Sequence, residues 1–157
     1  MSHSLTGARR PPEPSDRRSG PGRLLIAVYG IFAVSSTARA GYQIATKFGE
    51  APIAYLLSAL AAVVYIIATV SLARRGNSAF WVAVGAVGVE LVGVLTIGSF
   101  SIVDTGVFPH DTVWSAFGMG YGFVPLILPV LGLLWLYRHR PSKLDRIHID
   151  DEPRRTP

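Results

Sequence analysis

Four long apolar segments constrain this chain more than any other feature. A helix needs about 20 residues to cross ~30 Å of hydrocarbon at about 1.5 Å per residue. The first three segments reach this length, whereas the fourth, counted from residue 122, is too short. We therefore expect the fourth helix to begin earlier, near Asp111 to Trp114. The segments run over residues 24–46, 52–73 and 79–103, and up to residue 137.

The charged residues are gathered outside these segments. Half of the 157 residues are hydrophobic, and the mean hydropathy of +0.38 is one that soluble domains of this size rarely reach. We therefore predict an all-α membrane protein with a four-transmembrane-helix bundle over residues 24–137. A disordered basic tail (residues 1–23) precedes the bundle, and a charged cytoplasmic tail (residues 138–157) follows it. The sequence has no cysteine, which excludes disulfides, zinc–thiolate sites and thiol catalysis.

The basic residues predict the orientation of the bundle. Thirteen of the 15 Lys and Arg residues lie in the two tails or at Arg74 and Arg75, whereas the opposite side has only Lys47. By the positive-inside rule, both termini are cytoplasmic. We thus expect a multi-pass protein of the plasma (inner) membrane, with outer loops near residues 47–51 and 103–120.

Other interpretations of the termini remain open. Residues 24–40 resemble a signal peptide ending in Ala38-Arg39-Ala40, and cleavage there would leave three helices. The long basic lead and the apolar residues that follow Ala40 argue against it. Binding of the tails to anionic lipid headgroups is plausible. Nucleic acid is not an expected partner, because no aromatic or motif signature accompanies the charge.

Two ionisable residues, Glu90 and Arg39, lie inside the predicted spans. Each costs ~2.5–3.5 kcal/mol near a helix centre on insertion scales. A bidentate ion pair would relieve both costs, so we predict an intramembrane Arg39–Glu90 pair. Three alternatives are a snorkelling Arg39, a protonated Glu90 bonded to a neighbouring backbone group or hydroxyl, and a Glu90 that couples proton or cation transport.

Small residues recur on two of the predicted helices. Small faces let helices approach closely in lipid, where van der Waals contact replaces the hydrophobic driving force. They serve either packing inside the bundle, which we favour for most of them, or an interface with a partner subunit. The residues concerned are Ala54, Ser58, Ala62, Gly85, Gly88 and Gly93.

Residues 101–125 combine turn formers with aromatic side chains. We predict a loop anchored at the outer membrane surface by an aromatic belt. His110 beside Asp111 is too small a set for a metal site. The chain contains no nucleophile elbow, zinc motif or phosphate loop, so we predict no catalytic, cofactor-binding or metal-ligating residue. The expected belt consists of Phe108, Trp114, Phe117 and Tyr121.

Two stretches carry a resemblance to a known family. They are YQIATKFGEAPIAYLLSALAAVVYIIATVSLARRG (residues 42–76) and SIVDTGVFPHDTVWSAFGMGYGFVPLILPVLGLLWL (residues 101–136). They resemble a family of small four-helix integral membrane proteins of actinobacteria. Some members are labelled small drug/metabolite-type transporters, and a mycobacterial member is an accessory subunit associated with MCE-type lipid import systems. No functional residue transfers from the family.

The resemblance implies a non-enzymatic accessory subunit of a larger membrane complex, an MCE-type lipid import system, with lipids and a transporter permease as partners. The alternative is a small proton-coupled drug/metabolite carrier that works as an oligomer, with Glu90 as the coupling carboxylate. Small multidrug carriers are also four-helix proteins, but their essential Glu lies in the first helix. Here the carboxylate lies in the third, which weakens the carrier alternative.

Overall fold

The computed structural model describes residues 20–103 and 111–140, and these residues are all helix or turn, without a strand. The all-helical prediction is thereby confirmed for the described residues. Three of the helices are long and apolar enough to cross a membrane, and η1 with α4 forms a bent pair that adds a fourth crossing if counted as one span. This is consistent with a multi-pass membrane protein. The elements are α1 (Pro21–Lys47), α2 (Pro52–Ala73), α3 (Asn77–Val103), the 3₁₀ helix η1 (Ser115–Tyr121) and α4 (Val124–Arg138).

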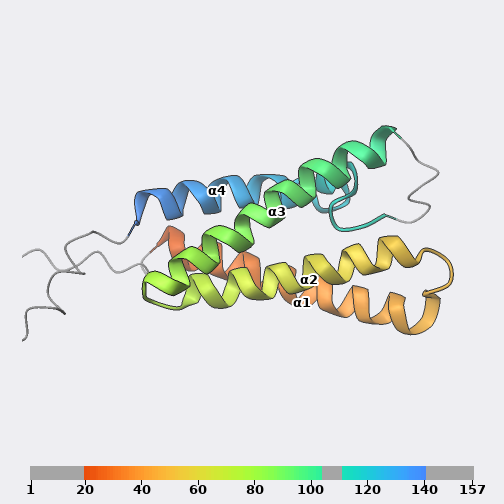
Figure 1. The fold of residues 1–157 in the computed structure, drawn as a ribbon, viewed down its shortest axis with the longest axis horizontal. Coiled ribbons are helices and arrows are strands. Elements are labelled where there is room, and N and C mark those ends of the chain that lie inside the picture. The colour runs from red at the N-terminus through yellow and green to blue at the C-terminus, as the bar shows by residue number, and fades with distance from the viewer. Residues whose placement is uncertain (1–19, 104–110, 141–157) are drawn as a thin grey trace, which may run out of the picture.

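The helices are arranged around a shared interior (Figure 1). α1 and α2 form a long antiparallel hairpin, which α3 crosses obliquely. α4 packs mainly against α3. Neighbours in sequence are neighbours in space, whereas α1 and α4 meet only over a short stretch. Among the described helices, α1 and α3 face each other diagonally without close backbone contact.

Charge separates the two ends of this bundle. The start of α1, the α2–α3 turn and the end of α4 lie together at one end (Figure 1). We call this the basic end, because its charged residues within the described ranges are all arginines. The opposite end holds the α1–α2 turn, where Lys47 and Glu50 form an exposed ion pair of 4.0 Å. The basic end is defined by Arg23, Arg74, Arg75, Arg138 and Arg140.

Prolines start three of the helices, and two of these, α1 and α2, begin near the expected positions. Pro21, Pro52 and Pro125 each occupy the first or second helical position, where the missing N–H costs nothing and the fixed φ favours the helix. α1 begins three residues before the predicted boundary. α1 ends and α2 begins on either side of residues 48–51, where a turn was predicted.

The predicted start of the fourth helix is wrong. α4 begins at Val124, not near Asp111 to Trp114, and η1 is bent from it by 100°. Ala116, Phe117 and Gly118 have φ values of 46°, 59° and 77°, in the left-handed region that a right-handed helix cannot contain. With 15 residues, α4 is about 22 Å long at 1.5 Å per residue, too short to cross a bilayer alone.

The segment before α4 is docked against α3 through two glycines. A Cβ on Gly93 would lie 2.7 Å from the Trp114 ring, and one on Gly98 would lie 2.6 Å from the Phe117 ring. The Ala116 amide donates to Ser101 Oγ at 2.7 Å. Trp114 is therefore only 2% exposed. Its predicted place in an interfacial aromatic belt is wrong, because the indole packs against Gly93 of α3 inside the bundle.

The close approach at Gly93 makes a testable prediction. Gly93→Ala forces the Trp114 ring to move, and overpacking of this kind typically costs about 1–3 kcal/mol. We expect a lower melting temperature in detergent. Gly85→Ala is the matched control on the same helix, because a Cβ there meets nothing within 4 Å and gains helix propensity. Equal stability of the two variants would contradict the seating of Trp114 on Gly93.

Candidate functional site, a buried carboxylate at the bundle centre

Glu90 lies at the middle of α3 and has no exposed surface. The Tyr29 hydroxyl of α1 donates a hydrogen bond of 2.7 Å to Glu90 Oε2. This bond crosses the bundle between the two helices that have no close backbone contact. A buried carboxylate needs a donor, because an unpaired polar group in an apolar medium costs several kcal/mol. The tyrosine hydroxyl meets part of that need.

Three further parts of the chain converge on the same point. Tyr65 of α2 packs against Tyr29 with ring centroids 6.2 Å apart, and its hydroxyl lies near both Glu90 and Trp114. From α4, Gly132 approaches so closely that a Cβ there would lie 3.3 Å from the Tyr29 hydroxyl. We call Tyr29, Tyr65, Glu90 and Trp114 the Glu90 cluster. The cluster contacts or contains a residue from all four α-helices.

The cluster has donors for more hydrogen bonds than it forms. Glu90 Oε1, Tyr65 Oη and Trp114 Nε1 are buried, and none has a hydrogen-bond partner within the described ranges. Two phenols and one indole can all donate, and a carboxylate can accept. A small side-chain rotation, or one water molecule, would join Trp114 to Tyr65 and Tyr65 to Glu90. The cluster is thus a set of hydrogen-bonding side chains that joins the helices, and it contains no nucleophile.

The predicted pair between Arg39 and Glu90 is not formed. Arg39 Nη1 donates to the Tyr121 hydroxyl, and Nη2 donates to the Asp111 carbonyl oxygen at 2.9 Å. The guanidinium carbon also lies 5.8 Å from the centre of the Tyr121 ring. Arg39 therefore ties α1 to the segment around η1. Of the open alternative in which a protonated Glu90 bonds to a backbone group or hydroxyl, the structure contains the bond to a hydroxyl, that of Tyr29.

The oblique crossing of α3 explains this difference. Equal depth along parallel helices would bring Glu90, at the middle of α3, to the middle of α1, halfway between Tyr29 and Arg39. Instead, Glu90 reaches Tyr29, ten residues before Arg39 and so about 15 Å away along the helix axis. Aromatic rings lie between the levels of Tyr29 and Arg39. Phe32 lies 5.5 Å from Tyr65 and 6.0 Å from Tyr121 between ring centroids.

The predicted small residues divide into two groups. Ala54, Ser58 and Ala62 are at most 5% exposed, so their small side chains are used in packing within the bundle. Gly93 likewise receives Trp114. Gly85 and Gly88 differ, because a Cβ on either would meet nothing within 4 Å, and both lie on the outward face of α3.

The other three residues of the predicted aromatic belt differ in their surroundings. Phe117 packs on Gly98, Tyr121 accepts from Arg39, and both are half-buried. Phe108 lies outside the described residues.

The sequence analysis missed Tyr29 and Tyr65. Both are fully buried, and both lie well inside apolar segments. Tyrosine in a membrane protein is most common at the interfaces, where its hydroxyl is hydrated. A tyrosine deep in a span therefore signals a polar partner in the interior, and Glu90 was the obvious acceptor.

Within the described ranges, no group of three or more His, Cys, Asp or Glu residues could hold a metal ion. Comparisons with protein-family models, curated proteins and solved structures found no match. The function must therefore be argued from the residues and their geometry.

A double-mutant cycle tests the Glu90 cluster. Tyr29→Phe and Glu90→Leu should each lower stability by ~1–3 kcal/mol, because each leaves a buried polar partner unsatisfied. The double variant should lose much less than the sum, since neither partner remains. Thermal unfolding in detergent measures all three variants.

Arg39→Gln combined with Glu90→Leu is the control cycle, and it should be additive within ~0.5 kcal/mol because the two residues share no partner. Coupling in this control and additivity in the tyrosine cycle would restore the Arg39–Glu90 pair.

Proposed function

We propose that the chain is a non-enzymatic accessory subunit of a larger membrane complex, an MCE-type lipid importer, which it stabilises or regulates. The observation that carries this proposal is the contrast between a closed interior and an uncovered, glycine-bearing face on α3.

The interior favours a structural role for the carboxylate. Glu90 has no exposed surface, accepts from Tyr29 and is surrounded by residues from every helix. A proton-coupled carrier needs its carboxylate to meet water during the cycle. In this arrangement, exposing Glu90 would first require breaking the cluster that joins the helices, which supports the subunit over the carrier alternative.

The outward face of α3 supports a partner in the membrane. Trp81, Gly85, Gly88 and Val92 recur at every third or fourth position and so share one face of the helix. Trp81 is 60% and Val92 63% exposed. The two glycines leave the backbone open to close approach, which is how helices associate in lipid. The exposed side chains of Trp81 and Val92, at the two ends of this face, give a partner helix something to pack against.

We name the complex in this proposal from the resemblance to the actinobacterial family. In that family, the mycobacterial member LucB is an accessory subunit of MCE-type lipid import. The present chain is likewise small and helical, and its buried polar groups join its own helices. The expected partners are the permease of the importer and the surrounding lipids.

We also propose that η1 and α4 together form a fourth crossing, so that both termini are cytoplasmic in the plasma membrane. The basic end holds the start of α1, the α2–α3 turn and the end of α4 (Figure 1), and the positive-inside rule favours its cytoplasmic placement.

Reporter fusions test this topology. A reporter after Pro157 should be active only as a cytoplasmic reporter, and one inserted at Gly49 should be active only as an external reporter. A C-terminal reporter on the outer face would contradict four crossings.

Association through α3 can be tested in the native host. The tagged full chain, purified in mild detergent, should bring down the permease, and Gly85→Leu should lower its recovery about tenfold, as loss of a central contact worth more than ~1.4 kcal/mol does. Gly41→Leu is the matched control, because Gly41 is exposed on α1 and also meets nothing within 4 Å.

Equal recovery with both leucine variants would contradict association through α3. Proton-driven uptake by the purified chain alone in vesicles, abolished by Glu90→Gln, would overturn the subunit proposal in favour of the carrier.

A further inference from the structure

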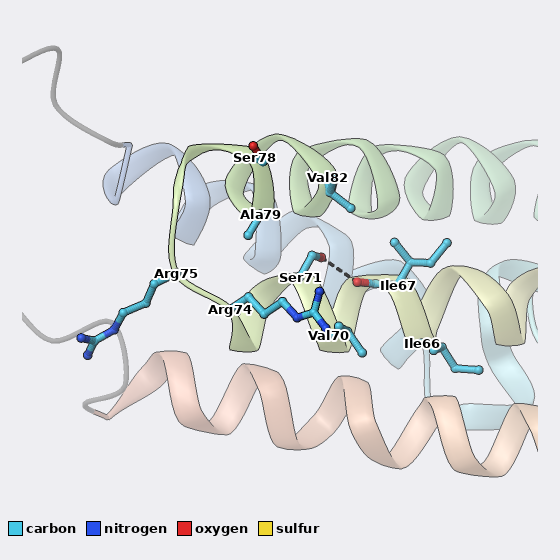
Figure 2. A pocket seen from close by; sticks show the side chains of 9 residues that line it. All are labelled: Ile66, Ile67, Val70, Ser71, Arg74, Arg75, Ser78, Ala79 and Val82. Atoms are coloured by element: carbon cyan, nitrogen blue, oxygen red, sulfur yellow. Dashed lines mark hydrogen bonds between the residues drawn. The ribbon is translucent and has the colours of Figure 1, made fainter. Parts of the chain in front are cut away.

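A groove of about 510 Å³ lies between α2 and α3 at the basic end of the bundle. This volume is within the range of ~300–1,000 Å³ that is usual for ligand pockets. Figure 2 shows the groove between the last two turns of α2 and the first turns of α3. Its lining shares no residue with the Glu90 cluster or with the outward face of α3 around Gly85 and Gly88.

The lining of the groove is polar at one end only. Ile66, Ile67 and Val70 of α2 and Val82 of α3 form its apolar part, and Arg74 lies at its mouth. Ile66 is eight residues before Arg74, so the apolar wall extends about 12 Å along the helix axis. A cation at the membrane interface followed by 12 Å of aliphatic wall matches an amphiphile with an anionic head.

Arg74 is free to bind an anion. Its backbone N–H is used at the end of α2, where it donates to the Val70 carbonyl oxygen at 3.2 Å. Its exposed guanidinium has no ion pair or hydrogen bond with the residues that the structure describes. Figure 2 shows the side chain reaching back along α2 toward Val70, whereas Arg75 extends away from the helices.

Other polar groups near the mouth have defined roles. The Ser71 hydroxyl already donates within α2, to the Ile67 carbonyl oxygen at 2.6 Å, so it is not the main donor to an anion. α3 begins at Asn77 beside the mouth, and the first turn of a helix leaves amides directed outward. These amides and Arg74 favour the same charge on a ligand.

The charge of the surroundings points the same way. The acidic residues within the described ranges are Glu50, Glu90 and Asp111, and none is at the basic end. An anion at Arg74 would therefore meet no acidic side chain of the described residues. A zwitterionic headgroup would bring its own cation beside Arg74, where no described acidic side chain could pair with it.

We propose that this groove binds one anionic phospholipid, with the phosphate at Arg74 and one acyl chain along the apolar wall between α2 and α3. The lipid is an annular ligand of this chain and not a transported substrate, because the groove opens at the membrane interface. The inference does not depend on the proposed partner complex.

Native mass spectrometry of the full chain in neutral detergent tests the proposal. Phosphatidylglycerol and phosphatidylcholine of identical acyl composition are the probes. The wild-type chain should retain one phosphatidylglycerol and bind phosphatidylcholine more weakly. Arg74→Gln should weaken phosphatidylglycerol binding about tenfold, as loss of a charged hydrogen bond does. Arg138→Gln removes the same charge outside the groove and should leave binding unchanged.

A second variant tests the apolar part. Ala79→Leu places bulk in the groove, which Ala79 lines, and should lower binding of phosphatidylglycerol while leaving Arg74 in place. Ala27→Leu, on the exposed side of α1, is its control. Melting temperatures of all variants report whether each is folded.

Several outcomes would overturn the proposal. Equal loss with Arg74→Gln and Arg138→Gln would reduce the effect to overall charge. Displacement of the lipid by millimolar inorganic phosphate would show an anion site without a place for the acyl chain. Retention of phosphatidylglycerol by a folded Arg74→Gln or Ala79→Leu chain would show that the lipid binds elsewhere. Failure of the permease to co-purify would leave this result unaffected, so the two proposals can fail separately.

Discussion

The hydrogen bond from Tyr29 to Glu90 is the interaction on which the rest of the bundle depends. It joins α1 to α3 across the interior, where their backbones do not approach closely. The bond forms where the oblique crossing of α3 brings Glu90 opposite Tyr29 (Figure 1). Once this bond forms, Tyr65, Trp114 and Gly132 must all fit around one carboxylate. In an apolar solvent, such a polar centre is costly to expose and so favours one arrangement of the helices.

Glycines allow the surrounding chain to close on this centre. Gly93 and Gly98 open α3 to the segment that includes Trp114 and Phe117, and Gly132 brings α4 to the Tyr29 hydroxyl. Arg39 then holds the same segment from α1 through Tyr121 and Asp111. Both ionisable residues inside the apolar spans are thus bonded within the protein. This accounts for their presence without assigning either one to transport.

The two proposed interaction surfaces share no residue and differ in chemistry. The face of α3 around Gly85 and Gly88 is uncharged and lies in the first half of the helix, which suits another helix. The groove at Arg74 lies at the basic end and combines a cation with aliphatic walls, which suits an anionic lipid. A subunit that held both would join a partner in the membrane to the lipid around it, and each surface could be altered without the other.

The sequence by itself determined the helical class, the three long spans and the turn near residues 48–51, because apolar length, prolines and charge placement act locally along the chain. It also identified Arg39 and Glu90 as residues needing partners. Only the tertiary structure decided those partners. Two residues at similar depths in different helices are close together only if the helices cross at a suitable angle, and the sequence does not give the crossing angle of α3. The same holds for Trp114, whose burial requires Gly93 to face it. It also holds for the start of α4, which depends on the left-handed backbone at Ala116 and Phe117, because neither residue type indicates such a conformation. Pairing and docking depend on contacts distant in sequence, and local patterns do not contain them.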